Sequence, residues 1–114
     1  MQKGLLAVAV LLAGCGSSGH VSMQEAVARS VCGACPGVTF RLSGIRTADG
    51  YATADVEPRP PGRYQGGTFL LHRRDGDWRT VTSWTDLAGT TCAELAREFK
   101  TPEDVLARLR VGPC

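Results

Sequence analysis

The chain has 114 residues, with 13 lysines and arginines against 11 aspartates and glutamates, and a formal net charge of +2 at pH 7. That length predicts one small domain with a modest core. The near balance of charge gives no electrostatic basis for nucleic-acid binding, so nucleic acid is not an expected partner.

The first fourteen residues have the parts of an export signal. One positive charge stands at Lys3, an apolar run extends from Leu5 to Ala13, and small residues follow it. The run is too short to cross a bilayer, because a spanning helix takes about 20 apolar residues. It ends in Leu12-Ala13-Gly14-Cys15. This motif resembles the lipobox of bacterial prolipoproteins, in which an apolar residue and two small ones precede a cysteine.

The resemblance implies a processed and lipidated chain. In that family the cysteine, here Cys15, is joined to a diacylglycerol, becomes the first residue after cleavage, and is often acylated on its amine. Two or three acyl chains hold a protein on a membrane. The expected cofactor is therefore only this covalent lipid, and the expected location is the exported side of the cell membrane. Gly16 after the cysteine implies the outer membrane, where the source has one. The expected organisation is a signal over residues 1–14, a flexible tether over 15–21 and one domain over 22–114.

The first element of the domain is predicted to be a helix. Ser22 and Glu25 have the spacing of a capping box, in which each side chain accepts a hydrogen bond from the other residue's backbone amide. The expected helix runs from Met23 to Cys32, and Pro36 prevents its continuation. Apolar residues recur every fourth position to form one stripe: Met23, Val27 and Val31.

Two strands are predicted next. Apolar and polar residues alternate over Val38–Ser43 and again over Tyr51–Glu57, and a turn at Ala48-Asp49-Gly50 joins them as a hairpin. The segment PRPPGRYQGG, residues 58–67, follows. Its prolines lack amide hydrogens and its glycines favour turns, so we expect a mobile loop that adds neither a strand nor a core residue.

A second hairpin is predicted from Thr68–Arg73 and Trp78–Trp84, joined by the turn RDGD. Strict alternation places four residues on one face: Trp78, Thr80, Thr82 and Trp84. We expect both tryptophans to cover the core or the sheet rather than to bind a ligand. Three arginines surround the turn with two aspartates among them, which favours a solvated hairpin over a phosphate or headgroup patch: Arg73, Arg74, Asp75, Asp77 and Arg79.

Two short helices complete the chain. Thr91 and Glu94 repeat the capping-box spacing, and Pro102 suits the first turn of a last helix. Their inward residues are expected to be Leu95, Phe99, Val105, Leu106 and Leu109. The fold class is therefore α+β, with an N-terminal helix packed on a four-stranded antiparallel sheet and two short C-terminal helices after it. This topology is similar to that of cystatin-like folds, a likeness that implies no function.

Four cysteines remain in the expected domain: Cys32, Cys35, Cys92 and Cys114. An even number outside the cytoplasm indicates disulfides, and four cysteines allow three pairings. If the two C-terminal helices form a hairpin, the start of the first lies beside the end of the second. Cys92 and Cys114 occupy those ends, so we predict that they are bonded and that Cys32 pairs with Cys35.

The motif CGAC also raises an alternative function, a thiol-disulfide redox protein using Cys32 and Cys35. Such enzymes place the first cysteine at the amino end of a helix, where amides stabilise a thiolate. Here the predicted helix precedes Cys32, which disfavours that function. No catalytic residue is identified. His20 and His72 do not complete a zinc spacing with the cysteines, so we assign them to the tether and to a strand and expect no metal. The favoured interpretation is a non-enzymatic, lipid-anchored envelope protein with a binding or structural role and an unknown protein partner.

Overall fold

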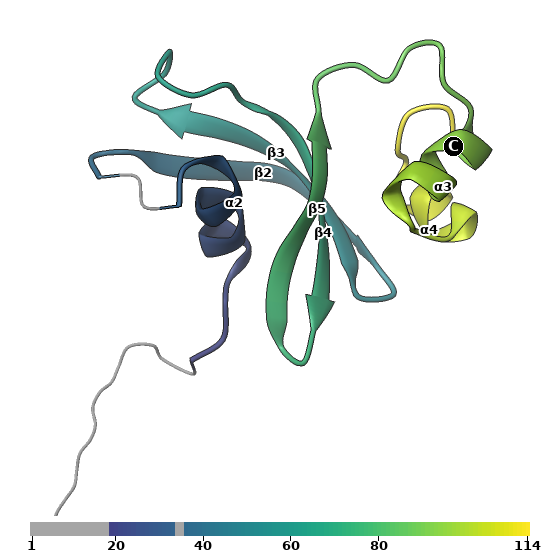
Figure 1. Cartoon of the computed structure of the whole chain (residues 1–114), viewed down its shortest axis with the longest axis horizontal. Helices are drawn as coiled ribbons and strands as arrows, with labels where there is room; N and C mark the ends of the chain where they lie inside the picture. The colour runs from purple at the N-terminus through teal and green to yellow at the C-terminus, as the bar shows by residue number, and fades with distance from the viewer. Residues whose placement is uncertain (1–18, 34–35) are drawn as a thin grey trace, which may run out of the picture.

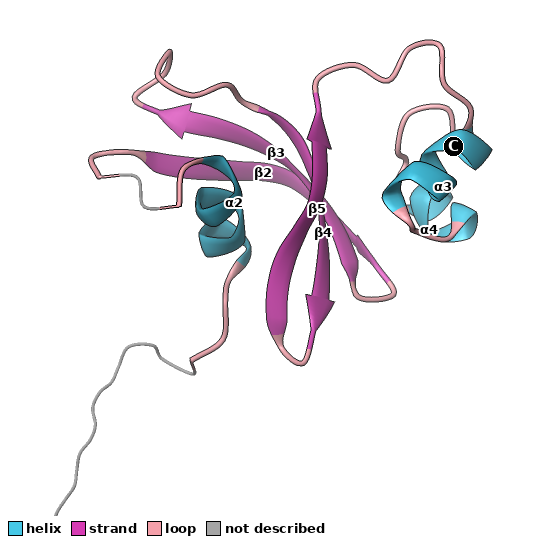
Figure 2. Cartoon of the chain, viewed as in Figure 1, coloured by secondary structure: helices cyan, strands magenta, loops and turns pink. Residues whose placement is uncertain are grey.

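The computed structural model describes residues 19–33 and 36–114. Its elements, in chain order, are α2 (Met23–Val31), β2 (Thr39–Ala48), β3 (Tyr51–Arg59), β4 (Gly67–Arg74), β5 (Asp77–Trp84), α3 (Cys92–Phe99) and α4 (Glu103–Arg108). The four strands form one antiparallel sheet in the order β2-β3-β4-β5. The predicted α+β arrangement is confirmed: one helix, four antiparallel strands and two short helices (Figure 2).

Both predicted capping boxes are present. The Glu25 amide donates to Ser22 Oγ at 3.1 Å, and the Ser22 amide donates to Glu25 Oε1 at 3.0 Å. Thr91 and Glu94 repeat this exchange at the start of α3. The hydrogen bonds from Thr91 lower the pKa of the Glu94 carboxyl. These side chains satisfy amides that would otherwise be unpaired at each helix start.

The sheet carries helices on both faces (Figure 1), with α2 on one side and the α3–α4 pair on the other. Leu70 and Leu71 are consecutive in β4 and both fully buried, which requires cover on both faces because successive side chains of a strand point to opposite sides. One core cluster, on the α2 side, contains Ala26, Val27, Phe40, Val56, Phe69 and Leu71. The other, on the α3–α4 side, contains Ala48, Leu70, Leu95, Phe99, Val105, Leu106, Leu109 and Val111.

The expectation that one face of β5 carries both tryptophans is wrong. Leu70 pairs with Thr82 while Leu71 pairs with Thr80, so Val81 is an extra residue in β5, a β-bulge. A one-residue insertion reverses the faces beyond it. Consequently Trp78 packs against the α2-side cluster, whereas Trp84 packs on the α3–α4 side and stacks on Phe99 with ring centroids 5.5 Å apart.

The prediction for the proline-rich segment is also wrong at its ends and in its packing. β3 continues through Pro58, which is buried and pairs with Phe40, and β4 begins at Gly67. The β3–β4 ladder ends at the pair of Val56 and Gly67. Pro58 therefore lies where β3 has β2 as its only partner strand in the described chain, a position that tolerates proline. Tyr64 packs on the α2-side cluster, 6.2 Å from the Phe40 ring.

Candidate functional site

A groove lies between the start of α2 and the edge strand β2, with a volume of about 630 Å³. We call it the α2–β2 groove. It is lined by Ser22, Met23, Gln24, Thr39, Phe40, Arg41, Leu42, Ile45 and Arg59. The N-cap Ser22 and the first two residues of α2 form one side of the groove. β2 contributes most of the other lining residues, so the groove runs along the β2 edge of the sheet. A concave surface with an apolar floor and a few polar groups is the usual form of a binding site.

The floor of the groove is held by core packing and by a hydrogen bond between α2 and β2. Phe40 is buried, 4% exposed, in the α2-side cluster. The Gln24 side-chain amide donates to the Phe40 carbonyl at 2.7 Å, which ties α2 to β2 at this point. At the start of α2, the capping box engages the backbone amides of Ser22 and Glu25 within the protein. Four of the nine lining residues are apolar, and they form the floor and one end of the groove: Met23, Phe40, Leu42 and Ile45.

A β-bulge shapes one end of the groove. Ser43 pairs with Asp55 and Arg46 pairs with Thr53, so two residues of β2, Gly44 and Ile45, oppose one residue of β3. Gly44 has a positive φ of 59°, and a Cβ there would lie 3.0 Å from Asp55 Oδ2, which makes glycine the residue that fits. The bulge turns Ile45 outward, and its side chain is 49% exposed.

Two arginines border the groove. Arg41 is exposed and forms no ion pair with any described residue. Arg59 Nη2 lies 3.3 Å from Glu57 Oε1, in a pair whose side chains are both at least half exposed. Such exposed pairs contribute between about 0 and 1 kcal/mol, so Arg59 exchanges this partner readily. The groove thus combines an apolar floor with a positively charged rim.

Two other hollows differ in chemistry. The first, of about 550 Å³, lies between the end of α2 and β5 and is lined largely by hydroxyl and amide side chains: Ser30, Gln65, Thr80, Thr82, Ser83 and Thr85. The described residues that line it include no acidic, basic or histidine side chain. The second, of about 160 Å³, contains Arg46, Asp55 and Arg110, but Asp55 Oδ1 already accepts a hydrogen bond from Thr68 Oγ1 at 3.0 Å.

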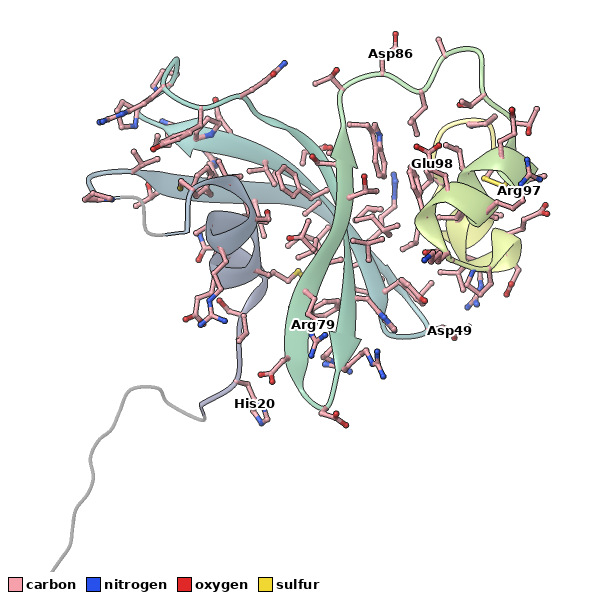
Figure 3. All side chains as sticks on the ribbon, viewed as in Figure 1. His20, Asp49, Arg79, Asp86, Arg97 and Glu98 are labelled. Carbon is pink, nitrogen blue, oxygen red and sulfur yellow. A yellow bond between two sulfur atoms is a disulfide. The ribbon has the colours of Figure 1, made fainter. Side chains whose placement is uncertain are left out.

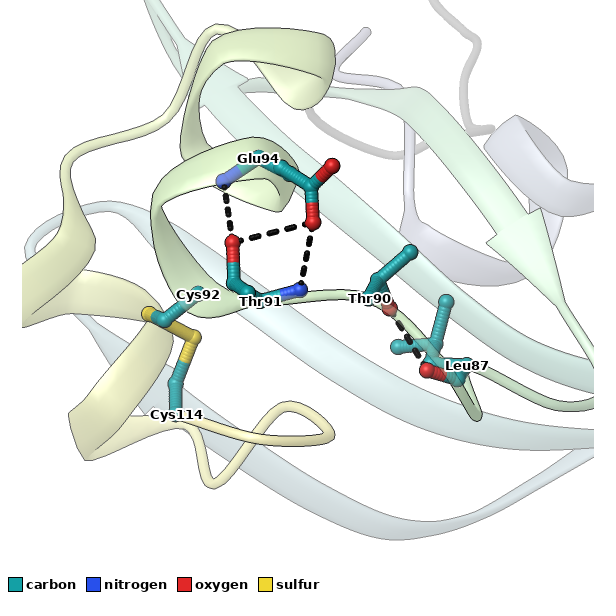
Figure 4. The surroundings of a disulfide bond; sticks show 6 residues. All are labelled: Leu87, Thr90, Thr91, Cys92, Glu94 and Cys114. Carbon is teal, nitrogen blue, oxygen red and sulfur yellow. Dashed lines mark hydrogen bonds between the residues drawn. A yellow bond between two sulfur atoms is a disulfide. The ribbon is translucent and has the colours of Figure 1, made fainter.

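The predicted Cys92–Cys114 bond is present, with Cα atoms 4.9 Å apart (Figure 4). It joins the first residue of α3 to the segment after α4, as the helical-hairpin argument required. Cys32 is the C-cap of α2 and is disulfide-bonded. Cys15 and Cys35 lie outside the described residues, so the expected lipidation and the expected Cys32–Cys35 pairing stay predictions.

The two histidines lie far from a metal-binding arrangement. His72 is in β4, as predicted, and stacks on Tyr51 with ring centroids 4.0 Å apart. Burial, then the nearby Arg74 and Arg79, lower the pKa of His72. His20 Nδ1 lies 3.5 Å from Asp77 Oδ1. Within residues 19–33 and 36–114, no group of three histidine, cysteine, aspartate or glutamate side chains could hold a metal ion.

The groove was not identified from the sequence. The alternating pattern of the first strand breaks at Gly44, and the predicted strand ends at Ser43, whereas β2 continues to Ala48. A glycine inside an alternating pattern is a signal for a bulge, and this one would have indicated the exposed Ile45. Arg41 and Arg59 carry no local signal, because only the pairing of β2 with β3 brings them to one groove.

Neither a protein-family model, nor a curated protein, nor a solved structure gives a significant match to the chain. Among the helices of the described ranges, none has the length and apolar character needed to span a membrane.

Proposed function

We propose that this protein is a lipoprotein anchored by Cys15 on the exported side of the cell membrane, where its domain binds a partner protein rather than catalysing a reaction. The anchor is supported by the lipobox at residues 12–15. The Cys92–Cys114 disulfide supports export, because such bonds persist in oxidising compartments outside the cytoplasm.

The observation that carries the binding role is the α2–β2 groove, in which an exposed Ile45 stands beside an apolar floor and two rim arginines. We infer that its occupant is an extended segment of a partner protein that carries acidic residues around an apolar side chain. The apolar side chain would cover Ile45 and the half-buried Met23 and Leu42. The carboxylates of the segment would face Arg41 and Arg59. An edge strand such as β2 is a common place for an extended segment to dock.

The thiol-disulfide alternative receives less support. Cys32 lies at the carboxyl end of α2, where the helix dipole disfavours a thiolate. A redox enzyme of that class uses the opposite placement.

Site-specific photocrosslinking in native membranes tests the binding role. A photoreactive residue at Ile45 is compared with one at Val81, which is also an exposed aliphatic residue at the bulge of an edge strand, 37% exposed, but lies on β5. We expect a discrete crosslinked partner from position 45 only. Reversing charge with Arg41→Glu and Arg59→Glu should remove that crosslink while leaving the melting temperature nearly unchanged. Equal crosslinking from both positions, or a crosslink indifferent to the charge reversal, would contradict the proposed groove.

The anchor is tested separately. Cys15→Ser should abolish metabolic labelling with a radioactive fatty acid and leave the signal uncut at this site. Intact-mass measurement of the membrane-associated protein should show a chain that begins at Cys15 with lipid attached. An unmodified Cys15 in the membrane-extracted protein would refute the anchor and leave the groove experiment unaffected.

A further inference from the structure

The chain enters the domain along the tip of the β4–β5 hairpin. The Val21 amide donates to Asp77 Oδ1 at 2.8 Å, and the Val21 carbonyl accepts from the Trp78 amide at 3.0 Å. The ring of His20 covers Gly76, where an added Cβ would lie 2.5 Å from His20 Cε1. Residues 20 and 21, which the sequence assigns to a flexible tether, are thus held against the hairpin (Figure 3).

This attachment limits where a lipid on Cys15 can lie. Gly19 is four positions after Cys15. An extended chain covers at most about 3.6 Å per position, or roughly 14 Å over these four steps. The next residue, His20, already contacts the hairpin turn. A lipid on Cys15 therefore holds the bilayer surface within reach of the hairpin tip, whichever way the rest of the domain points.

The hairpin tip is rich in exposed arginine. Arg73, Arg74 and Arg79 are all exposed, and none of them forms an ion pair with a described residue. Arg73 lies over the Trp78 ring, 5.5 Å from its centroid, on the face of the sheet that carries α2. Arg79 is opposite His72 on the other face. The arginines thus surround the tip on both sides of the sheet.

The two acidic residues of the tip oppose this charge only in part. Asp77 accepts the Val21 amide, and this hydrogen bond lowers the pKa of its carboxyl, with the His20 side chain contributing. Asp75 is exposed in the turn with a φ of 53°. Three arginines against two aspartates leave the tip with a net charge of +1.

The charge pattern alone favours a solvated hairpin here, but the structure holds residues 20 and 21 against this tip. We therefore propose that the β4–β5 hairpin tip docks onto anionic phospholipid headgroups and so sets the orientation of the domain on its membrane. The proposal rests on the proposed function, since the lipid on Cys15 brings the tip to the surface. Each basic residue near an anionic bilayer favours the docked state by a factor of about five. The net charge of +1 accordingly shifts the ratio of docked to undocked orientations about fivefold. A shift of this size is sufficient to favour the docked orientation, because the anchor already holds the domain at the membrane surface.

Fluorescence quenching tests this orientation. The full-length protein is produced in bacteria, extracted in detergent and reconstituted in vesicles that contain nitroxide-headgroup lipid. The substitution Trp84→Phe keeps an aromatic ring on Phe99 and leaves Trp78, which lies under Arg73 at the tip, as the single fluorescent reporter. We expect Trp78 to be quenched more strongly in vesicles that contain phosphatidylglycerol than in neutral phosphatidylcholine vesicles, with about a fivefold shift in the docked ratio.

Charge removal at the tip provides the decisive comparison. Arg73→Gln, Arg74→Gln and Arg79→Gln together should abolish the dependence on anionic lipid. The matched control removes three exposed arginines elsewhere, Arg63, Arg97 and Arg110, and should preserve it. Thermal melts establish that both triple variants are folded.

The outcomes separate the two proposals. Two results with a lipidated protein would overturn the hairpin proposal alone. One is Trp78 quenching that is the same in anionic and neutral vesicles. The other is a control variant that loses the dependence on anionic lipid as fully as the tip variant does. A protein that intact mass shows to carry no lipid on Cys15 overturns both. Quenching that disappears only in the tip variant supports the proposed orientation.

Discussion

The bond between Cys92 and Cys114 closes a loop with a sequence separation of 22 residues. In the chain-entropy relation, such a cross-link restricts the unfolded chain by an amount equivalent to about 3 kcal/mol. Typical domains have a free energy of unfolding of about 5 to 15 kcal/mol, so this bond supplies a large part of it. We predict that Cys92→Ala combined with Cys114→Ala lowers the free energy of unfolding by about 3 kcal/mol.

The surrounding structure gives no reason for a smaller effect. The loop contains the residues that cover the α3–α4 side of the sheet, including the fully buried Leu95, Leu106 and Leu109. Both bonded cysteines pack on the same cluster. Without the bond, the segment after α4 is held by contacts such as that of the Cys114 amide with the Val111 carbonyl. Alanine keeps apolar contact at both positions, so the variant reports mainly the loss of the cross-link.

Urea denaturation followed by circular dichroism measures the effect, since the urea midpoint falls while the slope reports any change in compactness. For a domain of this size, 3 kcal/mol corresponds to a decrease in Tm of roughly 12 to 24 °C. A variant that lacks Cys32 and Cys35 serves for comparison. If these two cysteines pair as predicted, their four-residue loop contributes about 2 kcal/mol to the free energy of unfolding in the same relation. The entropic reasoning would be refuted if the Cys92/Cys114 variant lost less than about 1 kcal/mol of its free energy of unfolding, or lost less than the Cys32/Cys35 variant does.

Two further predictions follow from contacts that the structure shows. Tyr64→Ala should lower the free energy of unfolding by about 1 kcal/mol, because the ring packs on Phe40 in the α2-side cluster; an unchanged urea midpoint would mean that the loop contributes no packing. The Val21 amide should lose its bond to Asp77 on acidification. Because the pKa of Asp77 is lowered in the folded protein, the contribution of this bond is present above the ordinary value of 3.8 and is lost as pH falls through the folded value. The Val21 amide resonance, followed by NMR from about pH 6 to about pH 2, should shift as Asp77 is protonated. A resonance that does not shift over this range would contradict the hydrogen bond between the Val21 amide and Asp77.

Local sequence patterns were sufficient wherever the deciding interaction is between near neighbours. The capping boxes at Ser22 and Thr91 join residues three apart, so their spacing marked both helix starts. The period-two alternation identified the four strands, and the pairing of Cys92 with Cys114 followed from two short helices of similar length. The lipobox is likewise a contiguous motif, and the expectation of a lipid on Cys15 rests on sequence alone.

Tertiary structure decided the features that depend on pairing between distant segments. The bulge at Val81 sends Trp78 and Trp84 to opposite faces, and it is visible only from the partners of Leu70 and Leu71 in β4. The packing of Tyr64 on Phe40 joins residues 24 positions apart, and no periodicity signals it.

The α2–β2 groove and the β4–β5 hairpin tip also depend on contacts between segments that are distant in the sequence. Arg41 and Arg59 border one groove because β2 and β3 run antiparallel in that register, and the sequence separates them by a whole hairpin. Val21 meets Asp77 across 56 positions, which places the entering chain on the β4–β5 hairpin. Composition and periodicity determine which segments become helices and strands. The register between strands determines which side chains share a surface, because a shift of one residue reverses every side chain beyond it.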